Sequence, residues 1–266
     1  PLGRANLGID FAGGVAIQLK FDKPFKINEM RKLLEEGGFK DADLQEFTEG
    51  NKLFIRLKTT EGNLRNISDG IKAVFLEKLP DNTFAIDSIT EVGPTVGKKL
   101  QKDAVLAIAI ALLGILLYVA WRFEFKFGVA AVIATSHDVL AVLGLYYITN
   151  KEINLLIITA LLTLAGYSLT DTVVVFDRIR ENLRKRAKEG LETLINRSIN
   201  EVLRRTIVTS VTTLMVLLAL IYFGGEVIHD FSLALFLGVL IGTYSSVFVA
   251  SPLLLIWKGK RGKLIR

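Results

Sequence analysis

Hydrophobic residues follow two different patterns along the 266-residue chain, and the pattern changes near residue 104. Before that point, short apolar runs alternate with polar residues, and their spacing switches between a period of two and helical spacing. After it, the apolar runs are long enough to cross the hydrocarbon core of a bilayer, which is about 30 Å thick. The pattern predicts a multi-pass α-helical membrane protein with a small polar domain ahead of its helices.

Residues 15–93 are predicted to form this small α+β domain. Period-two alternation indicates half-buried strands, and helical spacing of apolar residues begins near Ile27 and Leu64. The strands are expected at 15–21, 44–48, 52–58 and 84–92. The resulting order βαββαβ is that of a ferredoxin-like sheet with both helices on one face.

Five membrane spans are predicted after a polar linker at residues 94–103. They account for the high share of apolar residues, 51%, and for a mean hydropathy of +0.42. The predicted spans are 104–121, 127–148, 155–176, 206–223 and 231–257. The connection 177–205 contains apolar residues at helical spacing beside arginines, which predicts an amphipathic helix lying along the membrane surface.

The basic residues indicate how the chain is oriented. The connections 122–126, 177–205 and the tail 258–266 carry sixteen lysines and arginines, against four near the opposite ends of the spans. By the positive-inside rule the first group is cytoplasmic, so residues 1–103 are expected outside. A polar domain there needs a preceding span, so residues 1–14 are expected to be a leading segment that follows a first transmembrane helix absent from this sequence.

Composition and motifs argue against other classes of protein. The net charge of +6 is not arranged as the basic, aromatic-interleaved surface of a nucleic-acid-binding domain. The glycine-rich residues 8–14 match neither a Walker loop nor a dinucleotide fingerprint, and the acidic residues over 41–49 match no calcium loop. No nucleophile with a partner base stands out, and there is no cysteine. We therefore expect no enzyme activity, metal or cofactor.

Asp171 is the one ionisable residue among residues 155–176, and this makes it the strongest candidate for function. An ionised aspartate near mid-membrane costs roughly 2.5 to 3.5 kcal/mol on insertion scales, so it normally faces a partner or a proton path. Beside it runs a stripe of small and hydroxyl residues suited to helix packing, namely Thr159, Thr163, Gly166 and Thr170. Proton or ion handling is the favoured interpretation, and a structural aspartate is the alternative.

Other polar residues of the spans extend this hypothesis. His137 and Asp138 lie midway along the second span, and Arg205 opens the fourth, ahead of a hydroxyl run that includes Thr209 and Thr213. Such groups can pass protons, or they can form a hydrogen-bonded core that fixes helix packing, and the residues leave both possibilities open. On the last span, small residues one turn apart predict a packing seam through Gly238 and Gly242.

Six motifs spread over nearly the whole chain resemble the SecF family, the accessory membrane subunits of the bacterial and archaeal Sec protein translocase. They are GIDFAGG at 8–14, EVGPTVG at 91–97, WRFEFKFG at 121–128, SHDV at 136–139, GYSLTDTVVVFDRIREN at 166–182 and RRTIVTSVTTL at 204–214. The resemblance implies a helix bundle of the resistance-nodulation-division (RND) type, with six transmembrane helices and an external ferredoxin-like domain after the first.

The resemblance also implies a function and a set of partners. Family members reside in the cytoplasmic (inner) membrane and work with SecD, using the proton-motive force to help move preproteins through the SecYEG channel. The essential aspartate of the family matches Asp171, and its essential arginine matches Arg205 better than Arg204. A second carboxylate would come from SecD. Helix movements would reach the external domain through the 104–121 span.

Two alternatives remain at this point. The chain is a structural or assembly subunit of a membrane complex without proton conduction, or it is a small-molecule RND-type exporter. An exporter needs larger external domains with a substrate pocket, and a domain of about 80 residues argues against that.

Overall fold

The computed structural model describes residues 6–47, 51–58, 64–185 and 190–256. Residues 1–5 of the expected leading segment, 186–189 of the long connection and the tail 258–266 lie outside the described residues. The chain divides into two compact units. The small unit comprises Gly3–Ala104 and Glu152–Leu155, and the membrane unit comprises Val105–Lys151 and Leu156–Arg266, with Pro1–Leu2.

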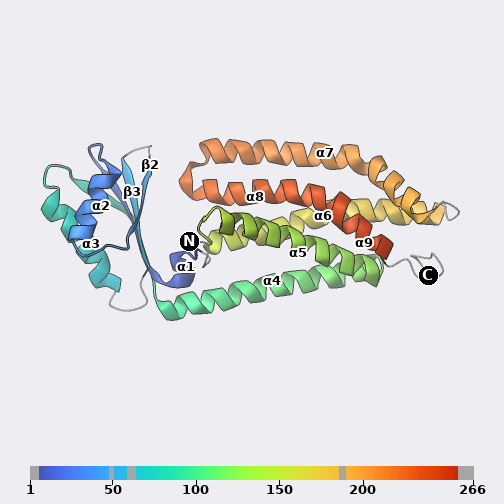
Figure 1. Ribbon diagram of the computed structural model, residues 1–266, viewed down its shortest axis with the longest axis horizontal. Coiled ribbons are helices and arrows are strands. Elements are labelled where there is room, and N and C mark those ends of the chain that lie inside the picture. Colours follow the sequence, from blue (N-terminus) through green and yellow to red (C-terminus); the bar gives the residue numbers. More distant parts are fainter. Residues whose placement is uncertain (1–5, 48–50, 59–63, 186–189, 257–266) are drawn as a thin grey trace. The chain divides into compact units, whose positions relative to one another are not determined.

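The small unit contains a four-stranded antiparallel sheet in the order β2-β3-β1-β4. Helices α2 and α3 cover one of its faces (Figure 1). In chain order the elements are α1 (Ile9–Ala12), β1 (Gly14–Phe21), α2 (Ile27–Glu36), β2 (Asp43–Phe47), β3 (Lys52–Lys58), α3 (Leu64–Lys78) and β4 (Phe84–Val92). The predicted βαββαβ order and ferredoxin-like sheet are confirmed.

Aromatic rings close the core of the small unit where its two covering helices meet the sheet. Phe21 at the end of β1 contacts Phe75 of α3 edge-on, at 5.8 Å between ring centroids, and Phe84 of β4 at 5.5 Å. The inward side chains of β1, Ile17 and Leu19, are fully buried beneath the helices. The alternation in residues 15–21 therefore arises because successive side chains of β1 point to the helix-covered face and to the open face of the sheet in turn.

A pair of glycines turns the chain from α1 into β1. Gly13 has φ of +82° and Gly14 has φ of +147°, which side chains of L-residues rarely adopt. A Cβ on Gly14 would also overlap the carbonyl oxygen of Leu57 on β3. The glycines of the GIDFAGG motif thus allow the backbone to turn and to lie directly against β3.

Among the described residues, five helices are long and apolar enough to cross a membrane, and the predicted spans fall on them. They are α4 (Pro94–Arg122), α5 (Phe125–Ile148), α6 (Leu155–Lys185), α7 (Leu191–Phe223) and a last span that joins α8 (Gly225–Ser245), a π-helical turn (Ser246–Ala250) and α9 (Ser251–Ile256). Helices α7 and α8 run side by side (Figure 1). Phe127 of α5 packs edge-on against Phe176 of α6, with 5.2 Å between centroids, in the main core cluster.

The structure differs from the sequence-based expectation in two connections. Residues 94–103, expected to be a linker, form the first turns of α4. The long connection 177–205 contributes to α6 and α7, and its apolar residues Leu191, Leu194 and Ile195 are buried in the core cluster of the bundle. This apolar stripe packs on protein, so the predicted helix along the membrane surface is instead the start of α7.

The π-helical turn in the last span has a local cause. Pro252 lacks a backbone N–H, so the α-helical hydrogen bond to the preceding turn is lost there. The hydroxyl of Ser251 donates to the carbonyl of Ser246, five residues earlier, at 2.9 Å and adds a side-chain hydrogen bond across the turn.

The glycine turn generates a first prediction. Gly14→Ala should destabilise the small domain by about 2 to 4 kcal/mol, because the new methyl group meets the β3 backbone and the φ angle is strained. Gly93→Ala is the matched control, since a Cβ there meets nothing within 4 Å. Urea-dependent pulse proteolysis of the purified protein measures both, and equal midpoints for the two variants would contradict the argument.

Candidate functional site

Asp171 lies on the buried side of α6, with 7% of its surface exposed. Ser210 and Arg205 of α7 lie close enough to influence the charge of its carboxyl. No hydrogen bond to Ser210 and no ion pair with Arg205 is formed among the described residues, and the Ser210 hydroxyl contacts Thr243 at 2.7 Å. The second carboxyl oxygen, Oδ2, is buried without a hydrogen-bond partner among the described residues. A carboxyl with one free, buried oxygen next to a cation is only partly compensated, and it is the kind of group whose charge changes when a proton or water arrives.

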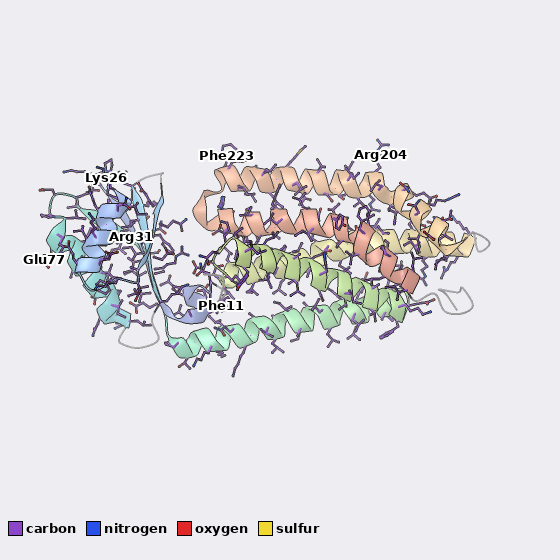
Figure 2. All side chains as sticks on the ribbon, viewed as in Figure 1. Phe11, Lys26, Arg31, Glu77, Arg204 and Phe223 are labelled. Carbon is purple, nitrogen blue, oxygen red and sulfur yellow. The ribbon has the colours of Figure 1, made fainter. Side chains whose placement is uncertain are left out.

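The two neighbouring arginines of α7 have different surroundings. Arg205 acts on Asp171 and also lines a hollow of about 330 Å³ with charged residues of α6, among them Asp177 and Arg178. The Arg204 side chain points away from the bundle (Figure 2). The structure therefore brings Arg205, and not Arg204, to the candidate aspartate.

Further unpaired polar atoms lie on the same two helices. Thr172, next to Asp171 on α6, and Thr206, next to Arg205 on α7, each bury a hydroxyl oxygen without a partner among the described residues. A buried polar group normally finds a hydrogen bond, because leaving one unmade costs about 1 to 3 kcal/mol. Both helices thus carry buried polar atoms that a water would satisfy.

Asp138 occupies a different and fully compensated environment. It is completely buried on α5, and its Oδ2 accepts hydrogen bonds from Ser168 of α6 at 2.5 Å and Ser245 of α8 at 2.7 Å. Its Oδ1 lies 3.0 Å from Nδ1 of His137. We call Asp138, Ser168 and Ser245 the Asp138 clasp, since the carboxylate joins three helices.

The remaining polar candidates do not gather around Asp171. The side chain of His137 is 44% exposed and lines the outer surface of α5 with Ile133 and Leu140. The hydroxyls of Thr209 and Thr213 donate to carbonyls of their own helix one turn earlier, and Thr213 also accepts from Tyr167 of α6 at 3.3 Å. A direct hydroxyl ladder leading to Asp171 is therefore not formed by these two threonines.

The predicted packing residues fall into two groups. A Cβ on Gly238 would lie 2.6 Å from the methyl carbons of Leu164, and one on Gly242 would lie 3.1 Å from Cβ of Ser168, so the seam on α8 packs closely on α6. Gly166 is different, because a Cβ there meets nothing within 4 Å. It lies in an exposed stripe of α6, comprising Thr159, Thr163, Gly166 and Thr170, which we call the α6 stripe. The expected packing of this face against helices of the same chain is not observed.

Three serines complete these environments. Ser210 belongs to the hydroxyl run predicted on the fourth span, whereas Ser168 and Ser245 are not among the residues that the sequence pattern singles out. Ser168 lies three residues before Asp171, and Ser210 lies four residues after Thr206, so helical spacing would have placed both on buried faces. Ser245 is separated from its partner Asp138 by more than a hundred residues, so the sequence offered no sign of the contact.

Family models and known proteins match this chain over most of its length. The model of the family described as protein export membrane protein SecD/SecF, C-terminal, matches residues 72–260, and that of the SecD/SecF GG motif matches residues 5–25. Protein translocase subunit SecF of Thermodesulfovibrio yellowstonii is 56% identical over 96% of this chain and 84% of its own length. The same subunit of Calditerrivibrio nitroreducens is 45% identical over 96% of this chain and 85% of its own length.

Solved structures give the same picture. The crystal structure of SecDF, a translocon-associated membrane protein from Thermus, superposes with a TM-score of 0.83 at 39% identity. SecDF in its super-membrane-facing form gives a TM-score of 0.69 at 40% identity. Each comparison covers 96% of this chain and 35% of the SecDF chain, so the chain spans about a third of those proteins.

The Asp138 clasp generates a second prediction. Ser168→Ala combined with Ser245→Ala should destabilise the membrane unit by about 1 to 3 kcal/mol for each lost donor, because the buried carboxylate oxygen is left unpaired. Thr212→Ala is the control, since that exposed hydroxyl donates only to carbonyls of its own helix, and it should stay within about 0.5 kcal/mol of the parent. Thermal unfolding in detergent measures the difference, and a double variant as stable as the control would show that the clasp contributes nothing.

Proposed function

This chain belongs to the SecD/SecF family of protein export membrane proteins, and we propose that it couples the proton-motive force to the movement of preproteins across the membrane. It acts as the SecF subunit beside SecD, and the pair assists preproteins that pass through the SecYEG channel. It is a multi-pass membrane protein, and we place it in the bacterial cytoplasmic (inner) membrane with its small domain on the external side. The charge asymmetry of its connections supports this orientation.

One observation carries the proposal: Asp171 is buried in a bundle of membrane-spanning helices with one carboxyl oxygen unpaired and Arg205 acting on it from α7. A carboxylate that is neither exposed nor fully hydrogen-bonded gains from accepting a proton, whereas the nearby guanidinium favours the charged form. Small changes in the position of α7 relative to α6 would shift this balance. Asp171 thus takes up and releases protons, and Arg205 adjusts its charge.

The α6 stripe supplies the place for the partner. It is exposed, it consists of one glycine and three threonines, and it borders Asp171 on the same helix. Small residues let two helix backbones approach closely in a membrane, where packing and interhelical hydrogen bonds drive association. We place a helix of SecD on this stripe, and that helix would bring the second carboxylate of the proton site.

The competing function is that of a structural subunit without proton conduction. The Asp138 clasp is the observation that favours it. The clasp shows that this bundle can hold a buried carboxylate whose two oxygens are both paired by residues of the same chain. Asp171 differs because its Oδ2 is left without a partner among the described residues. Removal of its charge distinguishes the two functions.

Asp171→Asn in the full-length protein should lower preprotein export about tenfold or more while membrane levels and SecD association stay normal. The amide keeps the shape of the carboxyl but cannot exchange a proton. Complementation of a strain depleted of its own SecF measures export. Asp177→Asn is the control, because this exposed carboxylate on the same helix pairs only loosely, at 3.8 Å, with Arg122. Export at the parental level in Asp171→Asn would make Asp171 a packing residue and the subunit structural.

Gly166→Leu should weaken association with SecD about tenfold or more without destabilising the chain itself, because the new side chain projects from an open face of α6. Gly114→Leu on α4, where a Cβ also meets nothing within 4 Å, is the matched control and should leave association unchanged. Co-purification of SecD in mild detergent reports both. Equal recovery of SecD with the two variants would exclude the α6 stripe as the docking face.

A further inference from the structure

Four residues between α5 and α6 belong to the small unit and not to the membrane unit. Ile153 forms a parallel bridge with Leu7, in which Gly8 N donates to Ile153 O at 2.8 Å and Ile153 N donates to Asn6 O at 2.8 Å. Gly8 lies close to this segment, since a Cβ there would lie 2.5 Å from Oε1 of Glu152 and 3.0 Å from Cβ of Asn154. The segment ahead of the sheet thus holds the chain immediately before α6 begins.

The first residue of α6 is bound by the same segment. The backbone N–H of Leu155 donates to Oδ2 of Asp10 at 3.0 Å. The first four N–H groups of a helix have no partner inside the helix, and a carboxylate at this end also interacts favourably with the helix dipole. Asp10 therefore acts as a cap supplied from a residue far away in the sequence, and it fixes the end of α6 to the small unit.

An ion pair adds a second tie. The guanidinium of Arg56, on β3, pairs with the carboxylate of Glu152, and only 17% and 11% of these side chains are exposed. Arg56 also contacts Asp43 at 3.4 Å, but that carboxylate is 65% exposed. Partial burial lowers the pKa of the neighbouring Lys58, and the charge of Arg56 lowers it further. Glu152 is thus the more buried of the two carboxylates that pair with Arg56.

The start of α4 is held by the same segment. Gln101 of α4 donates to the carbonyl of Phe11 at 2.9 Å, and a Cβ on Gly97 would lie 2.7 Å from that same oxygen. Phe11 is buried in α1 and is labelled in Figure 2. Residues 6–12 therefore contact the first turns of two membrane helices and continue, through the glycine turn, into β1, which lies between β3 and β4.

We propose that residues 6–14, Arg56 and residues 152–155 form a mechanical joint, here called the α6 joint, which delivers axial movement of α6 to the small domain. Asp171 lies on that helix sixteen residues beyond Leu155, or about 24 Å at 1.5 Å per residue. A continuous helix is stiff along its axis, so a displacement at Asp171 arrives at Leu155 and passes to β1. Asp10 and the Arg56–Glu152 pair are positioning residues. The joint rests on the proposed function, because it transmits a movement that proton exchange at Asp171 produces.

This route differs from transmission through the 104–121 span alone, because it acts on the helix that carries the carboxylate. The ion pair is its most sensitive element. Reversal of one charge in a largely buried pair leaves two like charges in contact, which separates the partners. A joint opened in this way uncouples the domain but leaves Asp171, Arg205 and the α6 stripe untouched.

The test uses the full-length protein assembled with SecD. Glu152→Arg should lower preprotein export about five-fold or more, with SecD recovery and the proteolysis midpoint of the small domain unchanged. Asp43→Asn removes the other carboxylate at Arg56 and should export normally. In the Asp43→Asn background, Glu152→Arg combined with Arg56→Glu should restore at least half of the lost export. Glu152→Gln replaces Glu152→Arg if charge reversal lowers the proteolysis midpoint.

A covalent tie separates mechanical linkage from local stability. The chain has no cysteine, so Leu7→Cys with Ile153→Cys introduces a single pair at the parallel bridge. Oxidation of this pair in the Glu152→Arg protein should restore export, and reduction should abolish it again. Normal export in Glu152→Arg, or export that neither the charge swap nor the oxidised pair restores, overturns the joint. Asp171→Asn, measured in parallel, tests the proton site itself, so failure there is recognised separately.

Discussion

The membrane unit is governed by the cost of keeping two carboxyl groups inside an apolar helix bundle. Each group must find donors or a countercharge within the bundle, because water is not available to solvate it. Asp138 meets this requirement completely, with two serine hydroxyls and a histidine nitrogen around it. Asp171 meets it only in part. Ser210 and Arg205 lie near its carboxyl, but its Oδ2 has no hydrogen-bond partner among the described residues. This contrast in pairing supports our proposal that the first carboxyl serves packing and the second exchanges protons.

Close packing around Asp138 sets the frame in which Asp171 can remain incompletely paired. Gly242 and Gly238 bring α8 against α6, and the clasp then ties α5, α6 and α8 together at one level. Helix α7 shares an apolar cluster with α6 at its start, and elsewhere it contacts α6 through polar side chains, as in Tyr167 with Thr213 and Asn182 with Ser198. Hydrogen bonds of this kind can be exchanged at lower cost than interlocked apolar side chains. The arrangement therefore suits a site whose pairing changes.

Helix α6 connects the features that matter for function. It contributes Ser168 to the clasp, it carries Asp171 and the exposed stripe, and its first residue is capped by Asp10 of the small unit. The GIDFAGG motif gains a physical meaning here. Gly8 leaves space for the side chain of Glu152, and Asp10 caps the first residue of α6. The last two glycines of the motif turn the chain into β1. A motif that resembles no ligand-binding loop is instead the place where the sheet and two membrane helices are tied together.

The sequence by itself determined most elements of both units and singled out Asp171 as a candidate, because periods of two and 3.6 and the length of apolar runs are local properties. It also pointed to Arg205, through position in a motif. Tertiary structure alone decided which polar residues meet. Burial on α7 selects Ser210 over Thr209, the open side of α6 leaves Gly166 free, and Ser245 reaches Asp138 across a long separation in sequence. Partners of this kind depend on how helices pack against one another, and a helical period fixes the face of a residue but not its neighbour.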